Sequence, residues 1–506
     1  MSYHEGLAAR ALATAGVMLA TLTISLDTTI ANVALPHMRG SLSAGQDQIT
    51  WVLTSYIVAT AMMTPLTGWL AVRWGRKRLF LISIIVFVAA SVLCGMAETL
   101  PEMVALRVLQ GIGGCAMVPL SQASLFDLWS PAQIPRMMSI WAVGATVGPV
   151  LGPTVGGFLT ENYSWRLVFY INVPIGIVSF LAIALAMAPD KPGQKRSFDL
   201  LGFIAFVMFS VGVQLVLDRG PSQDWLDSPE VGVEAFIAAC GLYVFVLHTL
   251  TTKAPFFHPD VIGNRNLWIC LTILIATTGV LYSTAALLPT FLQGLLGYSA
   301  LQSGLAVMPR GVGAIVAFVL APFAVERVGP RVTVASGMLM TIIGLWLLTR
   351  LDPSMTARPI EQSGFLLGFG QGLMINQLAV LVFATIPGSH RTEAAVFSNT
   401  IRTLGGSFGI AIAQALLIRQ SAAAHETLGA HVIASDPIVR WRLPELFGGG
   451  FGVEAINAEV TRQADAIAYN ATFAWLALAA VCMLPMVVLV RSARRLQKER
   501  AAVHVD

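Results

Sequence analysis

The sequence predicts an all-α polytopic membrane protein with fourteen transmembrane helices. The chain of 506 residues is 56% hydrophobic and 11% charged, and its mean hydropathy is +0.73. Soluble globular chains carry roughly 25% charged residues. Runs of about 20 mostly apolar residues, long enough to cross a bilayer as a helix, recur along the chain. The runs are continuous and do not alternate apolar with polar residues, which excludes the strands of a membrane β-barrel.

Fourteen such runs are present. They lie near residues 11–35, 48–71, 79–97, 103–127, 137–159, 167–188, 200–217, 231–250, 267–294, 303–325, 332–350, 362–386, 395–418 and 469–490. The ninth run is long, so we expect it to tilt or to kink at Pro289.

The basic residues predict that both termini lie in the cytoplasm. If the N-terminus is inside, the inside loops and tails hold 19 of the 31 lysines and arginines, and the outside loops hold 9. An excess of Lys and Arg in cytoplasmic loops is the usual pattern. The remaining three, Arg107, Arg310 and Arg402, fall within spans.

Other features exclude several classes of protein. The net charge of +4 is scattered over short loops, which does not indicate a nucleic-acid-binding face. The five cysteines lie in apolar stretches without CxxC pairing, so neither a disulfide framework nor a metal site is expected. No ATP-binding loop is present, so any pump would use an ion gradient. No His/Asp/Glu cluster or nucleophile–base arrangement indicates an enzyme, and no cofactor is expected.

An internal repeat predicts two related bundles. Residues 68–78 follow the second span, and residues 322–331 follow the tenth. At an offset of 254 the paired residues are Arg73 with Arg327, Gly75 with Gly329 and Lys77 with Arg331. If this match is not chance, residues 1–190 and 256–506 are two six-helix bundles, and residues 191–255 are two inserted helices. Two halves that rock about a midplane site are typical of secondary transporters.

Asp27 is a candidate proton-coupling residue. It lies within the first apolar run, in the string from Leu26 to Pro36. A carboxylate at membrane depth is costly, and such groups commonly face a cavity and mark ion or proton pathways. The alternative is a helix-capping or interfacial aspartate.

Arg107, early in the fourth span, is the second candidate for proton coupling. A buried guanidinium stays charged and needs a partner, so we expect it near Asp27 or near the waters around Asp27. An opposite charge favours the ionised form of an acid and burial favours the protonated form. A moving arginine would therefore switch the acid between two states. The alternative is a structural arginine bonded to backbone carbonyls.

The fifth span carries glycines at every fourth position, a pattern that lets another helix approach closely. We expect this face to seal the cavity between the halves, and its prolines to introduce kinks. A packing helix without a gating role fits the spacing equally well. The residues concerned are Gly144, Gly148, Pro149, Gly152, Pro153, Gly156 and Gly157.

The remaining polar residues in the spans are candidates for a substrate cavity. Arg310 and Arg402 are favoured because unpaired cations do not face lipid, whereas each lone amide fits a structural hydrogen bond better. The full set is Asn32, Arg310, Asn376, Gln377, Asn399 and Arg402, with Gln371 beside it. One deep acid against three arginines favours neutral or weakly acidic lipophilic substrates over dications.

Residues 419–468 form the one long hydrophilic segment predicted outside, and a helix is predicted over 453–468. Connections of this length tend to be functional or disordered. The segment is either a docking surface for a periplasmic partner or a flexible tether.

Four motifs together resemble the major facilitator superfamily, in particular its fourteen-span drug:proton antiporters of the EmrB/QacA type. They are the string around Asp27, the stretch from Arg107 to Gly114, the glycines of the fifth span, and the loop signature with Gly68, Arg73, Gly75, Arg76 and Lys77. Val72 stands where that signature usually has an acid, so a gate built on an acidic contact there is in doubt.

Several strings are similar to the EmrB branch: residues 171–176, 217–220 and 398–404. This resemblance implies an inner-membrane pump that works with a periplasmic adaptor (a membrane fusion protein) and an outer-membrane channel. It favours the docking role for residues 419–468. The function predicted is a proton-coupled multidrug efflux antiporter. Alternatives are a dedicated exporter of one metabolite, fatty acid or siderophore, and a membrane sensor or scaffold that transports nothing.

Overall fold

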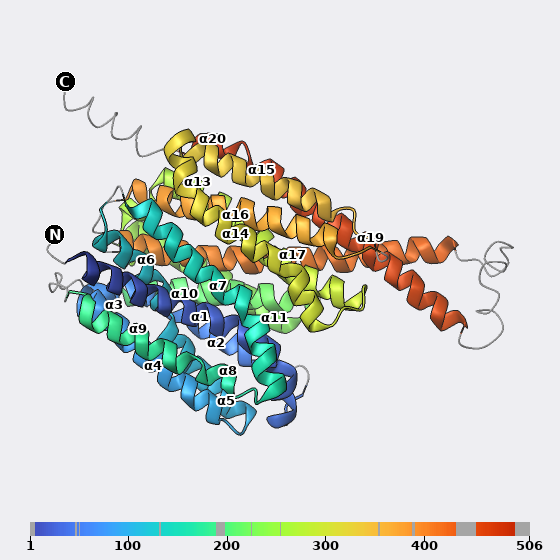
Figure 1. Ribbon diagram of the computed structural model, residues 1–506, viewed down its shortest axis with the longest axis horizontal. Coiled ribbons are helices and arrows are strands. Elements are labelled where there is room, and N and C mark those ends of the chain that lie inside the picture. Colours follow the sequence, from blue (N-terminus) through green and yellow to red (C-terminus); the bar gives the residue numbers. More distant parts are fainter. Residues whose placement is uncertain are drawn as a thin grey trace.

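The structure is a computed structural model that describes residues 6–45, 48–49, 51–130, 133–188, 198–223, 225–252, 255–352, 355–386, 390–431 and 452–490. Within these ranges the regular structure is entirely helical (Figure 1). Thirteen helices are long and apolar enough to cross a membrane, and a pair bent by 56° at Pro65 makes a fourteenth span. Helices suit lipid because they satisfy their own backbone hydrogen bonds.

The first six spans are built from nine helices, because three spans are interrupted. The helices are α1 (Leu7–Ser41), α2 (Trp51–Met63), α3 (Leu66–Trp74), α4 (Arg76–Met96), α5 (Leu100–Gly114), α6 (Met117–Leu128), α7 (Ile134–Asn162), α8 (Leu167–Tyr170) and α9 (Asn172–Ala186). The pairs α2–α3, α5–α6 and α8–α9 correspond to the second, fourth and sixth predicted spans.

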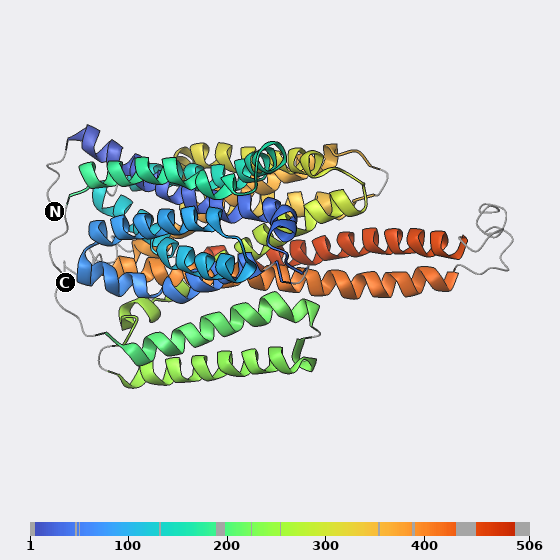
Figure 2. The ribbon, with the colours of Figure 1, turned by 90° about the horizontal axis from the view of Figure 1, so that it is seen from below.

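The remaining eight spans follow the predicted order. They comprise α10 (Leu200–Arg219), α11 (Pro229–Thr251), α13 (Arg265–Gly294), α14 (Ala300–Val328), α15 (Pro330–Leu348), α16 (Arg358–Ala384), α17 (Arg391–His431), and α19 (Gly452–Met483) with α20 (Met486–Leu489). A short helix, α12 (Pro259–Ile262), precedes α13. Pro289 lies inside α13 without ending it. The inserted helices α10 and α11 lie side by side along one side of the molecule (Figure 2).

The prediction of a long outside loop over residues 419–468 is wrong, because both described parts of this segment are helical. Its first part continues α17 to His431, and its last part belongs to α19, which begins at Gly452. The helix predicted over 453–468 is confirmed. The two helices extend together beyond the bundle (Figure 2) and are joined by Ser421 with Asp465 and by His425 with Asn457. Residues 432–451 lie outside the described part of the chain.

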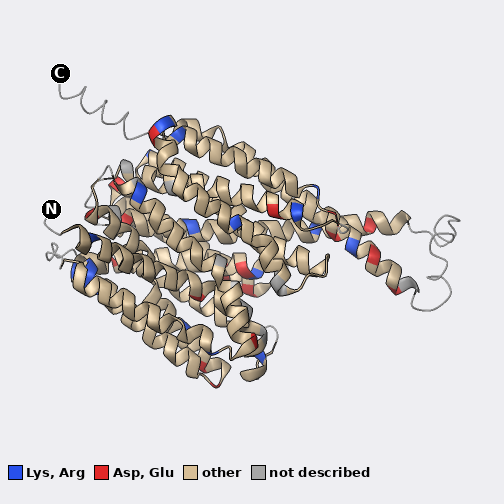
Figure 3. Cartoon of the chain, in the orientation of Figure 1, with Lys and Arg blue, Asp and Glu red and all other residues tan. Residues whose placement is uncertain are grey.

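The two ends of the bundle differ. One end, here called the termini end, carries the start of α1 and the helix α20 (Figure 1). The opposite end is called the projection end, because α17 and α19 extend beyond it. Figure 3 shows that most charged residues lie toward these ends and on the projection, and that few lie at mid-bundle. This is the distribution that a lipid environment imposes.

The repeat predicted from sequence is visible in the backbone. Gly75 separates α3 from α4 with φ 88° and ψ 148°, and Gly329 separates α14 from α15 with φ 84° and ψ 162°. Only glycine adopts this region without strain. Arg331 donates to the carbonyl of Val490 at 2.5 Å, which fixes the second turn at the termini end. The first predicted domain boundary, near residue 190, lies outside the described residues.

The halves share a core at the termini end. Phe318 of α14 packs in a cluster made otherwise of residues from the first half, and the rings of Phe126 and Phe383 lie 5.0 Å apart across the halves. Toward the projection end, two further clusters of described residues each belong to a single half, one around Leu26 and Met38 and the other around Phe291. The halves are therefore packed together at the termini end.

Candidate functional site

Asp27 and Arg107 form a buried ion pair. Asp27 lies on α1 and is 2% exposed, and Arg107 lies on α5 and is fully buried. Nη1 of Arg107 donates to Oδ2 of Asp27 at 2.7 Å. This confirms that the two charged groups lie together, as their burial in an apolar chain predicted. A desolvated pair of this kind is held only if the remaining polar atoms are also bonded.

Two further side chains complete the bonding of the carboxylate, and a third, Ser91, links these two. Gln110 and Asn172 each donate to Oδ1 of Asp27 at 2.9 Å. The same two amides also donate to the hydroxyl of Ser91, at 3.1 and 2.9 Å. No role was predicted for these three residues from the sequence. The available signal was weak: each is a polar residue in an apolar run, and Gln110 lies one helical turn after Arg107.

Arg107 also has partners other than Asp27. Its Nε donates to the carbonyl of Val52 at 3.0 Å, and its Nη1 also reaches Oε1 of Gln110 at 2.7 Å. The guanidinium lies over the ring of Tyr56, 4.4 Å from the centroid. Nη2 is buried without a hydrogen-bond partner among the described residues. The arginine therefore has partners that remain if Asp27 takes up a proton.

Glycines allow these helices to approach closely enough. A Cβ on Gly111 would lie 2.7 Å from the carbonyl oxygen of Tyr56, and one on Gly113 would lie 2.6 Å from the amide nitrogen of Phe87. Side chains at these positions would push α5 away from α2 and α4. The glycines that follow Arg107 thus hold the arginine within reach of its partners.

The glycine face of α7 packs on α1, the helix that carries Asp27. A Cβ on Gly148 would lie 2.6 Å from Cβ of Ser25, a Cβ on Gly152 would collide with Thr29, and one on Gly156 would lie 3.3 Å from Ile30. These contacts are within the first half and show the packing role, which is one of the two roles that the glycine spacing allowed.

The rest of this motif is more open. Gly144 approaches Met18, and Gly157 is half-buried. α7 runs unbroken past Pro149, which is exposed, and past Pro153, whose side chain lies outside the described part. α7 also packs against α14, so one helix contacts both α1 and the second half.

The cavity candidates fall into two separate groups. Arg310 of α14 is 7% exposed and donates to the carbonyl of Leu281 at 2.7 Å and to Oε1 of Gln371 at 3.1 Å. Arg402 of α17 donates to Oδ1 of Asn399 at 3.0 Å. Among the described residues, neither arginine has an acidic partner within ion-pair distance.

The other candidates are placed differently. Asn399 also donates to Gln122 at 3.1 Å and so bonds the two halves together. Gln377 is buried, with its amide nitrogen unbonded among the described residues. Asn32 is exposed and donates to the carbonyl of Thr28 at 3.4 Å. The side chain of Asn376 lies outside the described part of the structure.

The loop signature at the termini end makes helix-end contacts. Lys77 donates to the carbonyls of Ala184, at 2.7 Å, and Met187, where α9 ends. A cation is favourable at the negative end of a helix. Arg76 pairs with Asp127, and Arg73 lies over the ring of Trp69 at 5.0 Å.

Gly68 approaches the second half at the start of α17. A Cβ on Gly68 would lie 3.9 Å from Cα of Glu393. A small cavity lies here, lined by Pro65, Gly68, Trp69, Val72, Asp199, Pro255, Phe256, Phe257, Glu393 and Val396. Position 72 carries valine in place of the usual acid. An acid of the second half, Glu393, lines the same cavity as Val72.

The fold and the buried charges define a polytopic membrane protein of the transporter class. Residues 17–410 match the family model of the Major Facilitator Superfamily, and the chain belongs to that family. The multidrug export protein EmrB of Escherichia coli (strain K12) is 32% identical over 467 residues, which cover 91% of each chain. The fatty acid resistance protein FarB of Neisseria gonorrhoeae is 31% identical over 490 residues, which cover 96% of each chain.

Solved structures share the fold at low sequence identity. The human organic anion transporter MFSD10 superposes with a TM-score of 0.60 at 14% identity and covers 93% of this chain and 98% of its own. A bacterial homologue of the human lysosomal transporter Spinster, in an inward-facing unoccupied conformation, gives 0.58 at 18% identity and covers 96% and 99%. At these identities the likeness concerns the fold alone.

Proposed function

We propose that this protein is a proton-coupled multidrug efflux antiporter of a bacterial inner membrane, with both termini in the cytoplasm. The observation that carries the proposal is the buried pair of Asp27 and Arg107, because a transporter that couples to protons needs a titratable group at membrane depth. A sensor or scaffold has no need of this costly pair. The relatives named as multidrug export proteins support the same function.

In the proposed cycle, Asp27 alternates between an ionised state bound to Arg107 and a protonated state. Protonation removes the charge attraction, and Arg107 then keeps Gln110, the Val52 carbonyl and the Tyr56 ring as partners. The change loosens α1 from α5. Because α1 packs on α7 and α7 packs on α14, the shift reaches the contact between the halves. Rocking of the halves then gives alternating access.

The proton gradient is sufficient to drive this exchange. One charge moved across about 100 mV yields ~2.3 kcal/mol before any pH difference is added. A tenfold concentration ratio costs ~1.4 kcal/mol. One proton per neutral substrate therefore supports export against a gradient of roughly 50-fold.

We propose neutral or weakly acidic lipophilic compounds as substrates. Asp27 and Arg107 offset each other, which leaves Arg310 and Arg402 as cations without an acidic partner among the described residues. The relative named as a fatty acid resistance protein fits this charge balance. A dedicated exporter of one such acid is the second candidate, and that relative is the observation that favours it.

The experiment that tests the substrate class is a transport panel in proteoliposomes with an imposed proton gradient. We expect lipophilic weak acids and neutral drugs to be exchanged for protons, and dicationic dyes to be excluded. Arg310→Gln should lower transport of the weak acids by at least roughly tenfold, since a hydrogen bond to a charged group contributes about 1.5 to 3 kcal/mol. Neutral drugs should be little affected.

Arg350→Gln is the matched control, because Arg350 is exposed and stacks on Trp346. It should leave the panel unchanged. A strong preference for dicationic dyes would contradict the proposed substrate class, and transport of one compound out of the whole panel would favour the dedicated exporter.

We propose that the projection of α17 and α19 docks a periplasmic adaptor, a membrane fusion protein, which connects the transporter to an outer-membrane channel. The paired helices extend beyond the bundle and carry exposed polar residues, so they present a rigid surface outside the lipid (Figure 2). Hydrogen bonds between the two helices, such as that from Ser421 to Asp465, hold the two helices together.

Shortening the projection should separate export through the envelope from transport itself. We expect a variant in which residues 425–459 are replaced by a short Gly/Ser linker to lose drug resistance in Gram-negative cells. The cut leaves the Ser421–Asp465 pair in place, so transport in proteoliposomes should be retained. The same linker inserted after Gly297, in the short turn between α13 and α14, is the control and should retain resistance. Full resistance in the shortened variant would refute the docking role.

A further inference from the structure

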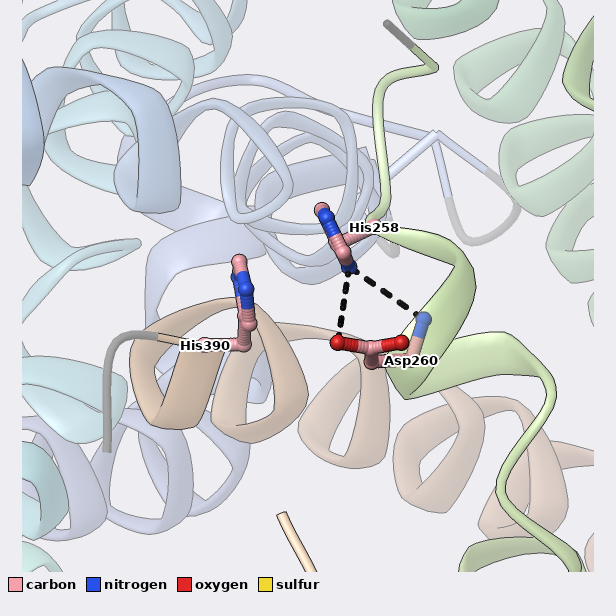
Figure 4. A group of neighbouring side chains, drawn as sticks. All are labelled: His258, Asp260 and His390. Carbon is pink, nitrogen blue, oxygen red and sulfur yellow. Dashed lines mark hydrogen bonds and ion pairs between the residues drawn. The ribbon is translucent and has the colours of Figure 1, made fainter. Parts of the chain in front are cut away.

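Two histidines that are distant in the sequence meet at the termini end. His258 immediately precedes α12, and His390 immediately precedes α17. Their rings are stacked, with centroids 4.0 Å apart and an angle of 17° between the planes. Asp260 lies beside them, with Oδ2 3.5 Å from Nδ1 of His258 (Figure 4). No such cluster was predicted from the sequence, because its members come together only in the fold.

The three side chains have the composition and spacing of a metal site. One nitrogen or oxygen from each lies within 4.8 Å of the corresponding atoms of the other two. Two imidazoles and a carboxylate are the ligands that borderline ions such as Zn²⁺ prefer, often with water in the fourth position. Metal–ligand distances near 2.0 to 2.2 Å place neighbouring ligand atoms about 3.3 Å apart, so the two imidazoles must turn out of their stacked arrangement to bind one ion.

The environment favours a cation. Nδ1 of His390 is buried without a hydrogen-bond partner among the described residues, so binding a metal there breaks no existing bond. Glu393 adds a second carboxylate, with Oε1 3.9 Å from this nitrogen. Oε2 of Glu393 accepts from the backbone amide of His258 at 3.0 Å, which already holds the two segments together.

We propose that His258, Asp260 and His390 bind a divalent transition metal ion of the zinc class. The ion joins the segment that leads into the second half to the first turn of α17. This is the turn in which Glu393 approaches Gly68 of α3, so the site lies beside a contact between the halves. No part of this proposal depends on which substrates are transported.

The test is a titration of the full-length purified protein with Co²⁺, followed by its visible absorption, and then displacement by Zn²⁺. The protein should carry an affinity tag free of histidine. We expect one Co²⁺ per chain, with absorption bands that are lost on adding Zn²⁺. His390→Asn and His258→Asn should each weaken binding by at least about 100-fold, because even the loss of an outer partner costs 10- to 100-fold.

Asparagine is chosen at position 258 because the Nδ1 atom of His258 accepts the amide of Asp260 at the start of α12, and an asparagine oxygen can replace it. His425→Asn is the matched control, since His425 lies on the projection and bonds to Asn457. It should bind Co²⁺ as the parent does. Absence of stoichiometric binding in the parent, or unchanged binding in either of the first two variants, would overturn the proposal.

Discussion

Asp27→Asn is expected to abolish substrate-driven proton movement in proteoliposomes. Asparagine keeps the size of the side chain and can still accept the hydrogen bonds that Gln110 and Asn172 now donate. It cannot ionise, so the pair with Arg107 is permanently lost as a switch. Coupled transport should fall to the level of protein-free vesicles, whereas substrate binding to the purified variant should be retained.

The control for this experiment is Asp465→Asn, which changes an acid on the projection that bonds to Ser421. Without an adaptor in the vesicles, this variant should couple normally. If Asp27→Asn also couples normally, the proton path lies elsewhere and the proposed mechanism is wrong. If it loses substrate binding as well, Asp27 shapes the substrate site and the assignment to proton transfer fails.

Arg107→Leu is expected to lower the stability of the protein strongly. Removing one partner of a buried ion pair leaves the other charge uncompensated, at a cost of about 3 to 5 kcal/mol. The variant should unfold at a much lower temperature in detergent than the parent. Arg350→Leu, at an exposed position, should cost below about 1 kcal/mol.

A double variant separates the charge effect from the loss of packing. Adding Asp27→Asn to Arg107→Leu removes the unpaired charge, so we expect it to restore a large part of the lost stability. Simple additivity of the two single effects would contradict this, because residues in one hydrogen-bonded network are expected to couple. Neither the single arginine variant nor the double variant should transport.

The fold was largely predictable because lipid imposes strong constraints. Each predicted span corresponds to a helix or to an interrupted pair, since continuous apolar runs leave few other solutions. The contact between Asp27 and Arg107 was also predictable, because two buried opposite charges in one half have few other partners. Gln110, Asn172 and Ser91 were not, because a lone amide or hydroxyl in a span carries no information about its partner.

The sequence predicted that certain surfaces make contacts, but it did not predict which element each of them contacts. The glycine periodicity of α7 predicted a close helix contact, but not that α1 provides it. The polar segment at 419–468 was predicted to lie outside the bundle with a helix over 453–468, but the continuation of α17 to His431, paired with α19, was not predicted. His258 and His390 meet through the tertiary fold, which no local pattern records.

Because α17 is one long helix, a small rotation of the second half would produce a large displacement at the far end of the projection. α17 runs without interruption from Arg402 and Asn399 inside the bundle to His431 beyond it. At 1.5 Å per residue, the stretch after Arg402 is about 44 Å long. A turn of the second half by about 10° displaces the far end of such a rod by roughly 8 Å. In the proposed cycle, a partner bound to the far end of the projection is therefore displaced whenever the halves rock, and its resistance to that motion opposes the rocking.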